Sequence, residues 1–265
     1  MYGSSPNACA VLTGAVLLLA SVVHAQPPNP LSAPPPAPDA NAALTRAIQL
    51  YDQHEYASAL PVFRDVASTG NVEAILYLGV MYGGGQGIPV DYDQAMYWFR
   101  KAADSGERQA MCNIGILYFR GLGVRQNYVE ALRWFRRSAD AGNDQGAYNL
   151  GVFYRDGLGI PVDYDAAVTW FRKAAKLGNN MAMNSLGVMY QQGQGVDVDY
   201  HEALNWFRAA AEDGNDSAMF NVGRAYEDGT GVLVSREQAV LWYRKAAAAG
   251  NAEAKLRLER LSALQ

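Results

Sequence analysis

The stretch Asn143–Gly178, NDQGAYNLGVFYRDGLGIPVDYDAAVTWFRKAAKLG, decides the fold, because versions of it recur every 36 residues along the chain. Two columns of glycine keep the same register through these copies. A third column contains every tryptophan of the chain, namely Trp98, Trp134, Trp170, Trp206 and Trp242. Self-similarity of this length indicates stacked supersecondary units, in which each unit packs on its neighbours.

Each copy predicts two helices joined by a glycine turn. In the first, helix A, an alanine or small residue, a leucine and a tyrosine recur at helical spacing. Gly151 falls within this helix, where glycine costs about 1 kcal/mol relative to alanine. We therefore expect a close contact with another helix that leaves no room for a Cβ. The turn carries a G-x-G pair, Gly157 and Gly159, and helix B begins at Asp163, a favoured N-cap residue.

The apolar face of helix B places Trp170 beside Phe171, and the pair recurs in every copy as tryptophan followed by phenylalanine or tyrosine. We expect both rings to wedge between helices, with the five tryptophans as structural residues. Replacing Trp170 with alanine is then expected to cost about 3–5 kcal/mol. An arginine recurs at the same position late in each helix B, as at Arg172. A cation near the C-terminus of a helix complements the helix dipole, and this explains the arginines better than a basic binding stripe does.

The N-terminal segment resembles a cleavable export signal. The apolar run Ala8–Val23 is shorter than the roughly 20 residues that a membrane-spanning helix needs. Val23-His24-Ala25 fits a signal-peptidase site, so we favour a cleaved signal over a retained anchor. The sequence therefore predicts a protein exported to the periplasm or secreted, with no membrane insertion after cleavage.

The complete domain plan follows from the signal, the repeats and the composition. The segment between the signal and the first helix holds seven of the eleven prolines, which is typical of a semi-extended tether. The predicted domains are a signal peptide (1–25), a proline-rich linker (26–41), a tetratricopeptide-like N-terminal capping repeat (42–70), five repeats (71–106, 107–142, 143–178, 179–214 and 215–250) and a C-terminal capping helix (251–265).

Motifs for catalysis or metal binding are not found in this sequence. The formal net charge is −4, which does not suggest a nucleic-acid partner. His24, His54 and His201 are scattered, and Cys112 is the one cysteine that remains after signal cleavage. The glycine turns lack the Gly-Lys-Ser/Thr of a phosphate loop. We predict no enzyme activity, no cofactor and no metal site, with a cell-wall hydrolase as the rival enzyme class.

The pattern A-x-x-x-L-G-x-x-Y, then G-x-G-[VI], then D-[YF]-x-x-A-x-x-W-[FY]-[RK]-K-A-A resembles the Sel-one-like repeat, a relative of the tetratricopeptide repeat. It stands here at Ala182–Tyr190, Gly193–Val196 and Asp199–Ala211, with Ala209 where the family often has a base. The resemblance implies an all-α fold, a right-handed α/α superhelical solenoid of helix-turn-helix repeats. It also implies a concave face lined by A helices and a non-catalytic scaffold or adaptor that binds other proteins.

We expect the ligand groove on the face of helix A opposite its Ala/Leu/Tyr face, with an extended peptide or a protein loop as the ligand. Asparagine offers a donor and an acceptor that match the peptide group, although the same asparagines could instead bond the preceding repeat. A peptidoglycan- or glycan-binding scaffold is the alternative, with Tyr77 and Tyr148 as its candidate aromatic residues. The candidate groove residues are Tyr77, Gln109, Asn113, Arg120, Gln145, Asn149, Asp156, Ser185, Gln192, Asn221 and Asp228.

Overall fold

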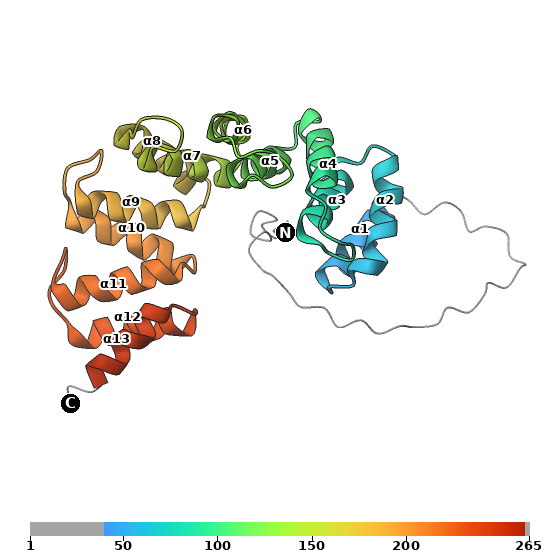
Figure 1. Ribbon diagram of the computed structural model, residues 1–265. Coiled ribbons are helices and arrows are strands. Elements are labelled where there is room, and N and C mark those ends of the chain that lie inside the picture. Colours follow the sequence, from blue (N-terminus) through green and yellow to red (C-terminus); the bar gives the residue numbers. More distant parts are fainter. Residues whose placement is uncertain (1–39, 263–265) are drawn as a thin grey trace, which may run out of the picture. The chain divides into compact units, whose positions relative to one another are not determined.

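The computed structural model describes residues 40–262, which form helices joined by short turns with no strand among them (Figure 1). The chain forms two compact units that divide after Gln126. The predicted signal peptide and most of the proline-rich linker lie outside the described residues. Between residues 40 and 262, no helix combines the length and the apolar character needed to cross a membrane.

The first unit is described from residue 40 and consists of helices that pack on one another in chain order, with α3 also contacting α5. The turn between its first two helices contains His54, which adopts a left-handed conformation (φ 62°). The helices are α1 (Ala40–Asp52), α2 (Tyr56–Ser68), α3 (Val72–Gly84), α4 (Tyr92–Asp104) and α5 (Arg108–Arg120).

The second unit also stacks its helices in chain order, and α7 additionally contacts α9. Within each unit the arrangement is the all-α solenoid of helix pairs that the 36-residue period predicts. The helices are α6 (Tyr128–Asp140), α7 (Asp144–Asp156), α8 (Tyr164–Lys176), α9 (Asn180–Gln192), α10 (Tyr200–Glu212), α11 (Asp216–Asp228), α12 (Arg236–Ala248) and α13 (Ala252–Ser262). We call α3, α5, α7, α9 and α11 the A helices, and α4, α6, α8, α10 and α12 the B helices.

The predicted helix ends are confirmed. The Asp163 side chain accepts a hydrogen bond from the backbone N–H of Ala166 at 2.9 Å, and the other four predicted N-caps make the equivalent bond. Each A helix ends at a glycine in the left-handed conformation, as at Gly157, whose N–H donates to the carbonyl oxygen of Phe153. These caps satisfy backbone groups that a helix terminus would otherwise leave without a partner.

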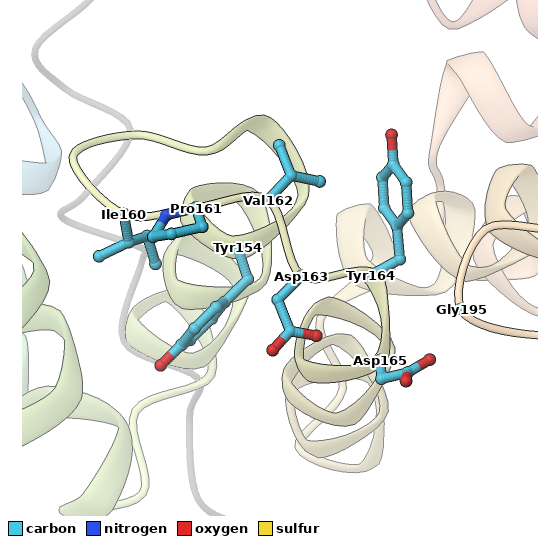
Figure 2. A pocket seen from close by; sticks show the side chains of 8 residues that line it. All are labelled: Tyr154, Ile160, Pro161, Val162, Asp163, Tyr164, Asp165 and Gly195. Atoms are coloured by element: carbon cyan, nitrogen blue, oxygen red, sulfur yellow. The ribbon is translucent and has the colours of Figure 1, made fainter.

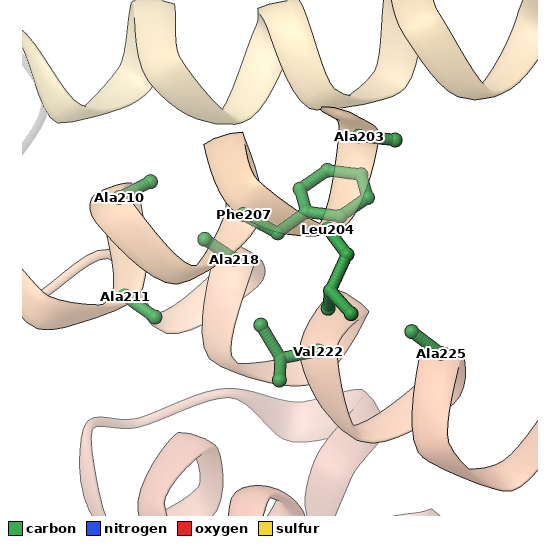
Figure 3. Close-up of a cluster of buried hydrophobic side chains, with 8 residues drawn as sticks. All are labelled: Ala203, Leu204, Phe207, Ala210, Ala211, Ala218, Val222 and Ala225. Atoms are coloured by element: carbon green, nitrogen blue, oxygen red, sulfur yellow. The ribbon is translucent and has the colours of Figure 1, made fainter. Parts of the chain in front are cut away.

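The glycine within helix A is required by a contact with an aromatic ring. A Cβ added to Gly151 would lie 2.5 Å from two ring atoms of Phe171, and Gly187 faces Phe207 at the same distance. Around this contact, alanines let α10 and α11 approach each other closely (Figure 3). The close helix contact predicted from the glycine column is therefore confirmed, and phenylalanine is the residue that makes it.

The two rings of each predicted pair differ in burial, because the phenylalanine or tyrosine is buried and the tryptophan is half-buried. All five tryptophans are half-buried, whereas Phe171 is 0 % exposed. Successive helical residues point about 100° apart, so only one ring of the pair can face the glycine. The Trp170 ring instead lies under cations, with Lys173 Nζ 4.7 Å and the Arg136 guanidinium carbon 5.3 Å from its centroid.

Candidate functional site

The candidate site is the A-helix face of the second unit, which we define by the half-buried and exposed side chains on one side of α7, α9 and α11. Spacings of three and four residues place these side chains on one face of each helix. The face mixes amides, apolar side chains and carboxylates. It comprises Gln145, Tyr148, Asn149, Val152 and Asp156 of α7, Asn184, Val188 and Gln192 of α9, and Phe220, Asn221 and Asp228 of α11.

Three predicted groove residues are buried, so the structure corrects their assignment. Asn113 is 1 % exposed, and Ser185 and Tyr77 are also buried. The Tyr77 ring stacks on Phe63 with centroids 4.7 Å apart, and burial raises the pKa of Tyr77 to about 12. The Ser185 hydroxyl donates to the Met181 carbonyl oxygen at 2.9 Å. These buried side chains cannot present their polar groups to a ligand on the surface.

The other predicted groove residues reach the surface in two groups. Those on the A-helix face of the second unit can act together, whereas Gln109 and Arg120 belong to the first unit. The exposed residues are Arg120, Asp156, Gln192 and Asp228, and the half-buried residues are Gln109, Gln145, Asn149 and Asn221.

Amide side chains pair on the A-helix face. Gln145 Nε2 donates to Asn149 Oδ1 at 3.3 Å, within one helix. Asn221 Nδ2 donates to Asn184 Oδ1 at 3.0 Å, which joins α11 to α9 of the preceding repeat. The alternative that these asparagines bond the preceding repeat is therefore confirmed for Asn221. Sequence reasoning did not include Asn184 in the site, although it is the one amide in a mostly apolar column.

The Asn184–Asn221 pair retains hydrogen-bonding capacity. A primary amide has two N–H donors and an oxygen that accepts. Their mutual bond uses one N–H of Asn221 and the oxygen of Asn184. The pair can therefore still present an N–H of Asn184 and the oxygen of Asn221, which together match the two polar groups of a peptide bond.

Two carboxylates on or near this face, Asp156 and Glu227, are paired with arginines. Both oxygens of Asp156 accept hydrogen bonds from Arg155, at 2.6 and 2.8 Å. Glu227 accepts from Tyr243 and Arg257. Burial alone would raise the pKa of Glu227, but these hydrogen bonds outweigh burial and hold the pKa below its usual value. An ionised carboxylate is a poor general acid, so Glu227 does not suit that role in a hydrolase.

Neither candidate for a glycan platform offers an open ring. Tyr77 is buried, as described above. Tyr148 is half-buried, with its ring centroid 5.7 Å from that of Phe171, and burial raises its pKa. Within residues 40–262, no group of three or more His, Cys, Asp or Glu side chains could hold a metal ion. Tyr77 and Tyr148 therefore do not form an open stacking surface for sugars.

The arginine column forms a ladder of hydrogen bonds that sequence reasoning missed. Five arginines late in a helix donate through Nη2 to the tyrosine hydroxyl at the end of the next A helix, 18 residues on. The constant spacing of the two columns could have revealed this pairing. The bonds are Arg64–Tyr82 (2.9 Å), Arg100–Tyr118 (3.1 Å), Arg136–Tyr154 (2.6 Å), Arg172–Tyr190 (2.6 Å) and Arg208–Tyr226 (2.8 Å).

We expect Arg172 and Tyr190 to show a coupling free energy of about 0.5–1.5 kcal/mol, the usual net contribution of a hydrogen bond. The measurement is a double-mutant cycle of Arg172→Ala and Tyr190→Phe, followed by urea denaturation. Arg244 provides the matched control, because Ser262 stands 18 residues after it in place of tyrosine. Equal coupling for Arg244 and Ser262 would contradict a specific role for the tyrosine hydroxyl.

Comparison with known proteins identifies the repeat. The Sel1 repeat model matches residues 72–107, 108–143, 144–179, 180–215 and 216–251. Among solved structures, a protective antigen of uropathogenic Escherichia coli strains with this repeat fold is 34% identical (TM-score 0.73), covering 83% of this chain and 48% of the antigen. This chain thus spans about half the length of that antigen. No curated protein matches the sequence.

Two further structures extend the comparison. A Sel1 repeat protein from Oxalobacter formigenes is 31% identical, with a TM-score of 0.73, over 82% of this chain and 86% of that protein. An immunity protein from Pseudomonas aeruginosa is 18% identical, with a TM-score of 0.56, over 83% and 85% of the two chains, and shares the fold alone. With five consecutive matches to the family model and these relatives, the chain belongs to the Sel1 repeat proteins, a generally non-catalytic family of protein-interaction scaffolds.

Proposed function

We propose that this protein is a non-catalytic scaffold whose A-helix face in the second unit binds an extended peptide or a protein loop. The observation that carries the proposal is the Asn184–Asn221 pair, which retains one donor and one acceptor for a peptide group. Val188 stands one turn after Asn184 and Phe220 directly before Asn221, and both side chains are half-buried, which leaves part of each for apolar contact with a ligand. Family membership supports the same class of function.

The dimensions of a helical repeat fit an extended ligand. Neighbouring packed helices lie about 10 Å apart, and an extended chain rises roughly 3.3 Å per residue. A ligand that crosses the A helices would therefore meet a new helix about every third residue. One amide pair between α9 and α11 could then hold one peptide group of the ligand while Val188 and Phe220 contact the side chains on either side.

We further propose that the protein acts after export, in the periplasm or outside the cell. The predicted signal peptide over residues 1–25 supports this location. The related E. coli protein is described as a protective antigen, which fits a protein that the immune system can reach. Fractionation of the producing cells, with N-terminal sequencing of the recovered protein, is expected to find Gln26 as the first residue. A retained Met1 would contradict cleavage.

Site-specific photocrosslinking in the producing cells tests the binding face. We expect p-benzoylphenylalanine placed at Gln192, at the exposed end of α9, to form an adduct with a polypeptide partner. Asn205 is the matched control, because it is an exposed amide on the B helix α10. The adduct yield from position 192 should exceed that from position 205 at least fivefold. Equal yields, or no adduct from position 192, would contradict binding on the A-helix face.

A second measurement asks whether the amides themselves contact the partner. With the photoreactive residue at Val188, the added changes Asn184→Ala and Asn221→Ala are expected to reduce the adduct several-fold. The melting temperature should stay close to that of the parent protein, because both side chains are only half-buried. An undiminished adduct would show that the asparagines serve the contact between repeats alone.

A further inference from the structure

A pocket lies on the loop side of the second unit, at the connection between α7 and α8. Its volume is about 650 Å³, and it is open to solvent. Figure 2 shows its lining, which comes from the end of α7, the connecting loop, the first turn of α8 and a glycine of the next repeat. The lining residues are Tyr154, Ile160, Pro161, Val162, Asp163, Tyr164, Asp165 and Gly195.

Large apolar side chains are exposed at this pocket. Val162 is 51 % exposed and Tyr164 is 38 % exposed, and both point to the same side of the loop (Figure 2). The pattern continues in the next repeat, where Val198 and Tyr200 are also exposed. Single exposed apolar residues need no explanation, but a group of them beside a pocket is typical of an interaction surface.

The charged side chains that line the pocket are acidic. The loop and first helical turn at 160–166, and the corresponding residues 196–202, contain no lysine or arginine. They contain the acidic residues Asp163, Asp165, Asp197, Asp199 and Glu202. Asp163 uses Oδ1 to cap α8, whereas Asp165 is exposed on the pocket wall. A cation does reach one edge, where Arg136 donates to the Tyr154 hydroxyl.

We propose that this pocket docks a basic, apolar segment of a partner polypeptide, in which lysine or arginine stands next to proline, leucine or valine. The cation of the segment pairs with Asp165 and with the second oxygen of Asp163. Its apolar neighbour packs against Pro161, Val162 and Tyr164. The carboxylates repel phosphate groups, which disfavours nucleic acid and anionic lipid as occupants.

This pocket is a second docking surface, formed by loop residues and separate from the A-helix face. Its occupation does not require a ligand on the A helices, so the two surfaces can be tested independently. Their side chains also differ in chemistry, because the A-helix face presents paired amides and the pocket presents carboxylates beside apolar side chains. Two such surfaces would allow one chain to hold two polypeptides at once, as a scaffold does.

Binding of fluorescein-labelled ten-residue peptides to the full chain tests the proposal by fluorescence anisotropy. The probe alternates arginine with leucine and proline. One control peptide keeps the arginines and replaces the apolar residues with glycine and serine, and another replaces the arginines with glutamate. We expect the probe to bind at least tenfold more tightly than the polar basic peptide, and the acidic peptide not to bind. No binding of the probe at 1 mM, or equal affinity for both basic peptides, would overturn the proposal.

Variants of the protein locate the binding. Asp165→Asn and Tyr164→Ser are each expected to weaken probe binding about fivefold or more. The matched controls are Asp104→Asn and Tyr97→Ser, both at exposed positions of α4. Unchanged melting temperatures show that the fold is kept. Wild-type affinity in the pocket variants, or an equal loss in the controls, would place the peptide elsewhere and overturn the proposal.

Discussion

Replacing Phe171 with alanine is expected to lower the free energy of unfolding by about 3–5 kcal/mol, the usual cost of removing a fully buried aromatic ring. The ring is 0 % exposed and fills the space that a Cβ on Gly151 would need. The helix contact at Gly151 cannot close over the resulting cavity without moving α7 against α8. Because repeats stabilise their neighbours, the loss should extend to adjacent helix pairs.

Trp170→Ala is the matched comparison, since it removes the larger ring from the preceding residue. Trp170 is half-buried and covered by Lys173 and Arg136, so we expect a smaller loss of about 1–2 kcal/mol. Urea denaturation followed by circular dichroism measures both variants without depending on the removed indole. If Trp170→Ala cost as much as Phe171→Ala, the indole would have to be part of the core.

Gly195→Ala is expected to destabilise the protein by about 2–5 kcal/mol, although it adds a single methyl group. Gly195 has a φ of 67°, a conformation that costs roughly 1–2 kcal/mol for other residues. A Cβ there would also lie 2.5 Å from the carbonyl oxygen of Tyr164, in the preceding repeat. That atom belongs to the backbone of α8, so relieving the clash requires one repeat to move against the other, at about 1–3 kcal/mol.

Gly178→Ala is the control that separates the cost of a positive φ from the cost of a steric clash. Gly178 has a φ of 92°, but a Cβ added there would meet no atom within 4 Å. We therefore expect only the conformational cost of about 1–2 kcal/mol. Thermal and urea denaturation of both variants give the difference. Equal destabilisation by the two changes would show that the contact between Gly195 and Tyr164 is loose.

The sequence by itself determined the repeat, the positions of its helices and the class of fold. These features depend on local interactions. A cap such as Asp163 bonds the backbone three residues on, and a turn glycine such as Gly157 needs only its own φ. The glycine within helix A also indicated a close contact correctly, because only a neighbouring group could explain its repeated cost.

Tertiary structure alone decided which side chains face the core, the neighbouring repeat or solvent. Phe171 rather than Trp170 enters the core because the rotation of α8 against α7 points it at Gly151. Asn221 bonds Asn184, and Asn113 is buried, although Asn113 and Asn221 occupy the same column. Residues that hold the same position in successive repeats lie at the same place on their helices, but residues of other helices determine whether each is buried. The burial and hydrogen bonds of the candidate site therefore could not be predicted without the packing of the helices.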